Sequence, residues 1–561
     1  MTGRGQNGEH SGVHRLNRYQ RVGLCADTAL CEEMQIIFQV YHKWSVNCGW
    51  YRGRRSVPRS DMMSYHFRGL FNVLGKCSKR GVMPTRIAKQ FLEGKRWFCP
   101  FLYYKTVSGR DTERHGFIME FITGVAKKDT LEISEILAGD YEGKTIKVNG
   151  AVHTIRDMGD VAFVVLRKRE GLLQCVYEEG VTKFDLKTLK EAATVEVEGV
   201  LAKEDRAPNG VELRLNTIRI LSEPTEQMPL QISKWKLKTS LEAKLNYRPV
   251  SLRNVRERAK FRIQEGIVRG FRDFLYEQGF TEIHTPKLGA KSAEGGANLF
   301  KLEYFHRPAI LQQSPQFYKQ MMVGVFDRVF ETAPVFRAEK HNTKRHLNEY
   351  TSLDFEMGYI DGFEDIMAME TGFLQYTMAL LQKEYSRELK ILGVTLPNTD
   401  KIPCVRFDVA KKQVAEKYNR EIRNPYDLEP EEEALIGQYY KEECDADFVF
   451  VTHYPSKKRP FYAMDDPEDK TYTLSFDLLY HGLEITTGGQ RIHSYPELLA
   501  KMEERGMTEE GMEQYLSAFK HGMPPHGGLG IGMERLTMQL LGEENVRETT
   551  LFPRDMSRLE P

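Results

Sequence analysis

One stretch of the chain, residues 336–357 with the sequence FRAEKHNTKRHLNEYTSLDFEM, gathers side chains suited to phosphate chemistry. Arg337 and Glu339 are two residues apart in a predicted strand, so both should point to one face. A Lys-Arg-His run at 344–346 follows on a predicted loop. Fixed positive charge beside a carboxylate suits reactions at nucleotide phosphates, because such sites act by positioning and electrostatics. Alone, the Arg–Glu pair would more often be a surface ion pair.

A distant second segment, HGGLGIGMERL at 526–536, strengthens the phosphate interpretation. Gly528 and Gly530 are two of four glycines there that would let the backbone approach a flat ligand. Arg535 lies in the helical stretch that follows. The chain has neither a GxxxxGK[ST] loop nor a GxGxxG segment placed after a strand. ATP would therefore have to be held by side chains and strands rather than by a phosphate-binding loop.

The elements that must position these segments are predicted from residue 250 onward. Long amphipathic stretches such as RERAKFRIQEGIVRGFRDFLYEQGF are mixed with strand-like ones such as RVFETAPVFRAE and GLEITTGGQRI. Because helices and strands do not alternate strictly, the pattern predicts an α+β domain on an antiparallel sheet at 250–561. A chain of 561 residues is also too long for one ordinary core, which favours several domains.

A different pattern precedes this domain. Residues 119–222 contain short segments of alternating polarity, broken by Gly, Asn and Asp, which predict about five strands of an OB-like barrel. Such barrels often bind single-stranded nucleic acid, although the fold alone does not establish that function. The prolines Pro224 and Pro229 mark 223–249 as a hinge.

Together these segments resemble the class II aminoacyl-tRNA synthetases, and within them the aspartyl group of archaeal and eukaryotic type. The resemblance covers roughly residues 130–561. GFTEIHTPKL at 279–288 is similar to motif 1 of the family, the FRAE segment to motif 2 and HGGLGIGMER to motif 3. It implies a class II catalytic domain preceded by an OB-fold anticodon-binding domain, and a homodimer with Pro286 at its interface.

The resemblance also implies an ATP site. Arg337 and Arg535 would hold the phosphates and act as the catalytic residues, Glu339 would contact the adenine amino group, and His346 the phosphate end. Tyr350 replaces a Phe of the family and keeps the stacking ring. The remaining residues assigned to ATP are Glu484, Gly528 and Gly530.

Magnesium is the cofactor that this resemblance implies. Asp477 and Glu484, in FDLLYHGLE, match the family's metal carboxylates. Mg²⁺ commonly takes one or two carboxylates together with phosphate oxygens and water, so two acids suffice. Thr487 stands where the family usually has Ser, and the hydroxyl is kept.

The same resemblance points to L-aspartate as the amino acid. Its side-chain carboxylate needs a cationic partner when buried, and Lys319 and Arg491 match the Lys and Arg that bind it in the family. Asparaginyl enzymes share the Arg but not the Lys, so Lys319 favours aspartate over that alternative. The other residues expected around the amino acid are Glu294, Gln316, Asp354 and Thr487.

The barrel carries the residues that match the family's anticodon contacts. Phe163 corresponds to the base-stacking aromatic and Gln174 to the reader of the middle base, although a strand Phe is usually core. Enzymes restricted to tRNA-Asp tend to carry Trp where this chain has His153 and Lys near Pro208. The chain therefore resembles non-discriminating enzymes that also charge tRNA-Asn.

Residues 1–118 match no motif. They contain 20 Lys and Arg against 8 Asp and Glu, so the remainder is net acidic by 11 within a total of +1. The segment could be a basic RNA-binding extension, a disordered tail, or an upstream stretch included before a start at Met119.

Eight cysteines without a CxxC pair, no long apolar run and no signal-peptide pattern predict a cytoplasmic protein without membrane contact. A synthetase-like tRNA-binding protein without catalysis is the remaining alternative.

Overall fold

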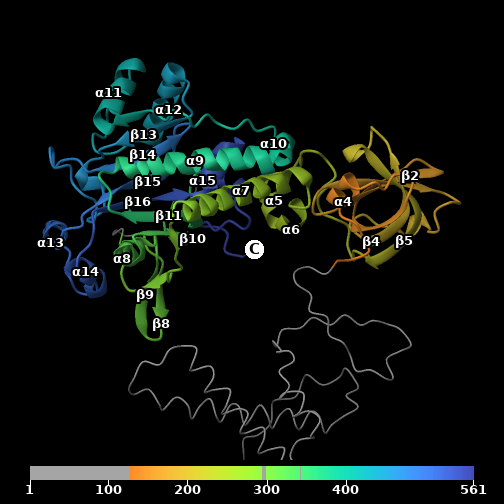
Figure 1. Cartoon of the computed structure of the whole chain (residues 1–561), viewed down its shortest axis with the longest axis horizontal. Coiled ribbons are helices and arrows are strands. Elements are labelled where there is room, and N and C mark those ends of the chain that lie inside the picture. Colours follow the sequence, from red (N-terminus) through yellow and green to blue (C-terminus); the bar gives the residue numbers. More distant parts are fainter. Residues whose placement is uncertain (1–126, 294–297, 341–342, 561) are drawn as a thin grey trace, which may run out of the picture. The chain divides into compact units, whose positions relative to one another are not determined.

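The computed structural model describes residues 127–560, apart from 294–297 and 341–342. The predictions for residues 1–118 and for Glu294 lie outside this part of the chain. Two domains are described, an all-β barrel and an α+β domain, as the sequence predicted (Figure 1).

The barrel consists of five strands that close in the order β1-β2-β3-β5-β4. Each strand alternates buried and more exposed residues, as in β4, where Val195, Val197 and Leu201 point inward. Because one side of every strand faces the barrel interior, apolar residues alternate with polar ones, and this alternation allowed the strands to be predicted from the sequence. The barrel elements are α4 (Ile133–Ala138), β1 (Thr145–Asp157), β2 (Val161–Arg167), β3 (Leu172–Glu178), β4 (Thr194–Lys203) and β5 (Val211–Ser222).

The α+β domain is built on an eight-stranded sheet in the order β12-β13-β14-β15-β16-β11-β10-β6. Only the pairs at its two edges, β12 with β13 and β6 with β10, are parallel. Its strands are β6 (Thr281–Glu282), β10 (Arg328–Phe336), β11 (Glu349–Gly358), β12 (Cys404–Arg406), β13 (Phe448–Thr452), β14 (Ser475–Tyr480), β15 (Leu483–Arg491) and β16 (His526–Gly532).

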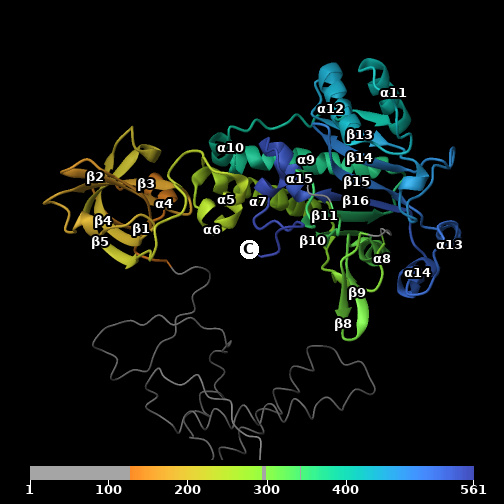
Figure 2. The same cartoon turned by 180° about the vertical axis from the view of Figure 1, so that it is seen from behind.

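Helices α7 (Val255–Glu277) and α9 (Glu364–Glu384) pack along one face of this sheet (Figures 1 and 2). Asn254 caps α7 by accepting hydrogen bonds from the backbone N–H groups of Arg256 and Glu257. Ile263, Ile267 and Phe271 follow at helical spacing and join the core with strand residues. The hydrophobic core thus covers one face of the sheet, and the opposite face is available for a functional site.

Further elements surround the sheet. A small sheet in the order β7-β9-β8 comprises β7 (Leu288–Gly289), β8 (Lys301–Tyr304) and β9 (Arg307–Leu311). The other helices are α5 (Leu241–Asn246), α6 (Arg248–Ser251), α8 (Gln316–Phe326), α10 (Ser386–Leu392), α11 (Phe407–Lys417), α12 (Pro430–Cys444), α13 (Tyr495–Glu504), α14 (Glu513–Lys520) and α15 (Met533–Leu541). The predicted hinge at 223–249 therefore contains a short helix, α5.

Candidate active site

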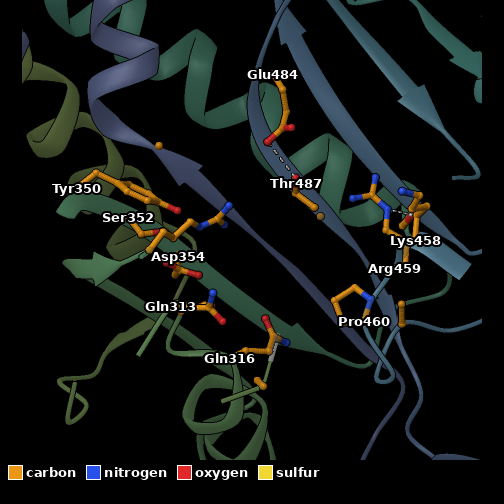
Figure 3. A pocket seen from close by; sticks show the side chains of 18 of the residues that line it. Gln313, Gln316, Tyr350, Ser352, Asp354, Lys458, Arg459, Pro460, Glu484 and Thr487 are labelled. Atoms are coloured by element: carbon orange, nitrogen blue, oxygen red, sulfur yellow. Dashed lines mark hydrogen bonds between the residues drawn. The ribbon is translucent and has the colours of Figure 1, made fainter. Parts of the chain in front are cut away.

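A cavity of about 760 Å³ lies on the sheet face opposite α7 and α9. Figure 3 shows Tyr350 and Asp354 of β11 on one wall, and Glu484 and Thr487 of β15 beside them. Arg459, on a loop before β14, stands across the cavity. The structure thus brings together motif 2, the β15 segment and motif 3, which are distant in sequence.

Arg337, Glu339, His346 and Tyr350 all line one end of the cavity. The guanidinium of Arg337 lies 5.7 Å from the Tyr350 ring centre, and Glu339 is 3.9 Å from both Arg337 and His346. The predicted strand position was wrong, because β10 ends at Phe336 and Arg337 and Glu339 follow it. Even so, an aromatic ring, a carboxylate and a guanidinium share a wall, as an adenine nucleotide requires.

Arg535 of α15 reaches the same cavity from motif 3. Its Nη1 donates to the Glu484 carbonyl at 3.1 Å and lies 3.5 Å from the Glu484 carboxylate. Its Nε donates to the carbonyl of Arg345. Arg535 is therefore fixed between β15 and the loop of motif 2, in reach of both.

The predicted metal carboxylates lie on neighbouring strands, with Asp477 of β14 opposite Thr487 of β15. The Thr487 hydroxyl donates to Glu484 at 3.3 Å, and Thr487 is the cross-strand neighbour of Asp477. Asp477 is buried and accepts a hydrogen bond from Arg459 at 2.8 Å. Burial and, to a lesser extent, the charge of Glu484 raise the pKa of Asp477 to about 6, although Arg459 lowers it.

This donor set fits magnesium in its chemistry, since it offers two neighbouring carboxylates, and their mutual repulsion would fall beside a cation. Within residues 127–560, as far as they are described, no group of three or more His, Cys, Asp or Glu side chains is arranged to hold a metal. Arg459 is a contact that the sequence did not reveal, because no spacing links it to Asp477.

The other end of the cavity holds a balanced cluster of buried charges. Lys319 of α8 is 2.9 Å from Asp354 and 3.3 Å from Glu356, and Arg491 of β15 is 2.8 Å from Glu356. Each of these four side chains is at most 7% exposed. The opposing cations hold the pKa of Glu356 below its usual value despite burial. Lys319, Asp354 and Arg491 line the cavity, and Glu356 lies beneath them.

Glu356 was missed by the sequence analysis, although a signal was present. It follows Asp354 by two residues on β11, so both carboxylates point to one face. The glycines of β16 have different roles from those expected. A Cβ on Gly528 would lie 2.2 Å from a Glu356 oxygen, so this glycine makes room for that carboxylate and does not line the cavity. The ATP assignment of Gly528 stays a prediction, and Gly530 lines the cavity.

Gln316 starts α8 and points into the cavity with its side chain almost fully buried (Figure 3). Its Nε2 has no partner in the described part of the protein. A buried amide donor without a partner suits a polar ligand group. Glu294, the remaining predicted amino-acid contact, lies among the residues that are not described.

Phe163 of β2 and Gln174 of β3 lie on the outer face of the barrel. The register places Phe163 opposite Val176 and Gln174 opposite Val165, so both side chains alternate with core residues. Gln174 donates to Glu212 of β5 at 3.3 Å. An aromatic ring and an oriented amide therefore share one partly exposed surface, as single-strand recognition requires.

The two residues linked to tRNA choice differ in exposure. His153 is the bulged residue between Val152 and Thr154 of β1 and is only 3% exposed. Burial lowers its pKa to about 4, and Arg167 adds to the effect. Pro208 is exposed and begins a 3₁₀ turn, Pro208–Gly210, after Ala207. Pro286 is exposed beyond β6.

Family models match nearly the whole described region. The model for tRNA synthetases class II (D, K and N) matches residues 240–556, and that for the OB-fold nucleic acid binding domain matches 146–221. The chain belongs to the class II tRNA synthetases.

Relatives of this synthetase are similar over most of their own length. It is 46% identical to "Aspartate--tRNA(Asp/Asn) ligase" of Deinococcus radiodurans over 75% of this chain and 97% of the relative. It is 40% identical to "Aspartate--tRNA(Asp) ligase" of Pyrococcus furiosus, over 76% of this chain and 99% of the relative.

Solved structures include both the aspartyl and the asparaginyl type. An asparaginyl-tRNA synthetase from Pyrococcus horikoshii with asparaginyl-adenylate has a TM-score of 0.69 at 30% identity, covering 75% of this synthetase and 97% of that chain. An aspartyl-tRNA synthetase from Entamoeba histolytica has a TM-score of 0.69 at 29% identity, covering 79% and 99%. The fold therefore does not distinguish the two amino acids. In the described residues, no helix combines the length and apolarity of a membrane span.

Proposed function

We propose that this synthetase activates L-aspartate with ATP and transfers it to tRNA-Asp. The observation that carries the proposal is the pair of buried cations, Lys319 and Arg491, at the amino-acid end of the cavity. A substrate carboxylate placed there would meet two fixed positive charges, whereas asparagine offers a neutral amide that needs only one. Relatives named aspartate--tRNA ligases support this assignment.

The opposite charges position the substrate in a defined direction. Asp354 and the unpartnered Gln316 line the same end, and we infer that Asp354 accepts the substrate's ammonium group. This arrangement would direct the α-carboxylate toward the arginines at the nucleotide end. Holding two reactants at contact distance lowers the barrier because the entropy of orientation is already lost.

We infer that Arg337 and Arg535 act on the phosphates and that Tyr350 and Glu339 receive the adenine. The substrate α-carboxylate would attack the α-phosphorus in line and form aspartyl-adenylate, and pyrophosphate would leave. The guanidinium groups would stabilise the developing charge, so no side-chain nucleophile is required. A ribose hydroxyl of the tRNA terminal adenosine would then attack the carbonyl of the aspartyl-adenylate, so that the aspartyl ester forms and AMP leaves.

Asp477 and Glu484 are the residues that would hold magnesium. Bound there with ATP, the cation supplies charge neutralisation at the phosphates. Thr487 orients Glu484 through its hydroxyl, and Arg459 holds Asp477.

We propose further that tRNA-Asn is also charged. Discrimination requires a contact that penalises the wrong first anticodon base. His153 is buried and Pro208 offers neither a cation nor an N–H donor, so these positions supply no such contact. The Asp/Asn names of relatives from Deinococcus radiodurans and Thermus thermophilus support this choice, while the Pyrococcus furiosus relative is named for tRNA-Asp alone. A homodimer with Pro286 at its interface and a cytoplasmic location stay predictions.

Amino-acid-dependent pyrophosphate exchange with aspartate, asparagine and lysine in parallel tests the proposed activation. We expect exchange with aspartate alone. Exchange with asparagine would indicate an asparaginyl enzyme, and no exchange with any amino acid would indicate a tRNA-binding protein without catalysis. Charging of tRNA-Asp and tRNA-Asn transcripts in the same preparation then tests the choice of tRNA.

A further inference from the structure

Helix α12 carries a carboxylate from outside all three motifs to the nucleotide end of the cavity. Its first turn begins at Pro430 and is held by a buried ion pair of 2.6 Å between Lys411 of α11 and Glu432. Farther along, Gly437 packs directly on the β14–β15 turn, where a Cβ would lie 2.3 Å from the Gly482 nitrogen. The helix is therefore fixed to the strands that bear Asp477 and Glu484.

Glu433 is the residue of this helix that faces the motif 2 loop. Its Oε2 lies 3.1 Å from Nη1 of Arg345, as an ion pair without an aligned hydrogen bond. The carboxylate is 10% exposed, whereas Arg345 is 29% exposed and lines the cavity. Burial and the nearby Glu484 raise the pKa of Glu433 to about 7, and Arg345 is its ion-pair partner at 3.1 Å and lowers that pKa.

The position of Arg345 affects the catalytic arginine as well. Its carbonyl accepts a hydrogen bond from Arg535 at 3.3 Å, and Arg535 also contacts Glu484. The preceding residue, Lys344, accepts a backbone bond from Val546, so the loop is tied to the protein on two sides. Glu433, Arg345, Arg535 and Glu484 thus form a continuous chain of contacts from α12 to the cavity.

We propose that Glu433 is a positioning residue that holds Arg345 at the triphosphate end of ATP. This inference rests on the proposed ATP-dependent activation of aspartate. Arg345 binds the terminal phosphates, and Glu433 fixes its guanidinium from the side away from the nucleotide. The helix pair α11–α12 is thereby part of the nucleotide site and not only a cover on the sheet edge (Figure 1).

Glu433→Gln tests the proposal, because the amide keeps the size of the side chain and removes its charge. In aspartate-dependent pyrophosphate exchange, we expect KM for ATP to rise about 5- to 30-fold and KM for aspartate to stay within about twofold. The matched control is Glu442→Gln, on the same helix, whose carboxylate is 43% exposed and pairs with Lys417 at the surface. It should change neither constant.

A double-mutant cycle with Arg345→Ala separates positioning from general damage. If Glu433 acts through Arg345, Glu433→Gln should change KM for ATP by less than about twofold once Arg345 is removed. Thermal unfolding of each variant checks that the fold is kept. An unchanged KM for ATP, equal rises for ATP and aspartate, or independent effects in the cycle would each overturn the proposal. Exchange by the unmodified enzyme with aspartate remains as the separate measure of the proposed function.

Discussion

The amino-acid end of the cavity and the outer face of the barrel both present polar groups, but they differ in solvent exposure. Lys319, Asp354, Glu356 and Arg491 are buried and balance one another. On the barrel, Gln174 contacts Glu212, which pairs with Arg214, and the Arg214 side chain is 69% exposed. Charge interactions are much stronger away from water. We therefore expect substitutions in the cavity to have large effects and those on the barrel to have modest ones.

The largest effect is expected for Lys319→Leu. The change removes one cation from the carboxylate site and leaves Asp354 and Glu356 short of a partner, which should cost about 2 to 5 kcal/mol in aspartate activation. Pyrophosphate exchange should fall roughly 30-fold or more. Lys412→Leu, which removes a lysine that is 68% exposed on α11, is the control and should be neutral. Near-normal exchange by Lys319→Leu would contradict the expectation that substitutions in the cavity have larger effects than those on the barrel.

The pH dependence of stability gives a second test of the buried region. Glu370 of α9 is fully buried and accepts from Thr486, and burial raises its pKa to about 8 from 4.5. Because the unfolded chain loses this proton at lower pH, the free energy of unfolding should fall as pH rises from 4.5 to 8. Glu370→Gln removes the titration and should be about 2 to 4 kcal/mol more stable than the unmodified protein at pH 8.5.

At pH 4 the two proteins should differ little in chemical denaturation, because Glu370 is then largely protonated in both the folded and the unfolded chain. Glu416→Gln, at an exposed position of α11, serves as the control and should follow the unmodified protein at both pH values. Equal stability differences at pH 4 and 8.5 would show that Glu370 does not titrate in this range.

On the barrel, Phe163→Ala should act on tRNA alone. Loss of one stacking platform costs about 1 to 3 kcal/mol per base, so KM for tRNA should rise about 5- to 150-fold. Pyrophosphate exchange should not change, because the cavity lies in the other domain. Leu221→Ala, at an exposed position near the end of β5, is the control. Loss of pyrophosphate exchange in Phe163→Ala would contradict the expectation that the barrel affects tRNA binding alone and the cavity affects aspartate activation.

The smallest effect is expected for tRNA choice. Pro208→Lys adds a cation at an exposed turn and should reduce charging of tRNA-Asn relative to tRNA-Asp, with a penalty of at most about 1 to 3 kcal/mol. His153→Trp places a larger ring in a buried site, so we expect it to lower the melting temperature of the barrel as well. Strong rejection of tRNA-Asn by the unmodified enzyme would contradict the proposed dual use.

Local patterns were sufficient for much of the fold. The five barrel strands and the helix over Val255–Glu277 were predictable because apolar residues recur with the period of the element. The site residues of motifs 2 and 3 were found from residue types and resemblance. The end of strand β10 was not predicted correctly, because an alternating pattern does not show where a strand stops. The strand ends at Phe336, one residue before Arg337.

The sequence by itself thus determined the two domain types, the family and many, but not all, of the residues that meet in the cavity. The tertiary structure decided which of those residues are buried and what they contact. It showed that Gly528 leaves room for Glu356, that His153 is buried, and that Glu433 pairs with Arg345. These outcomes depend on contacts between residues far apart in the chain, and no local spacing encodes such a distance.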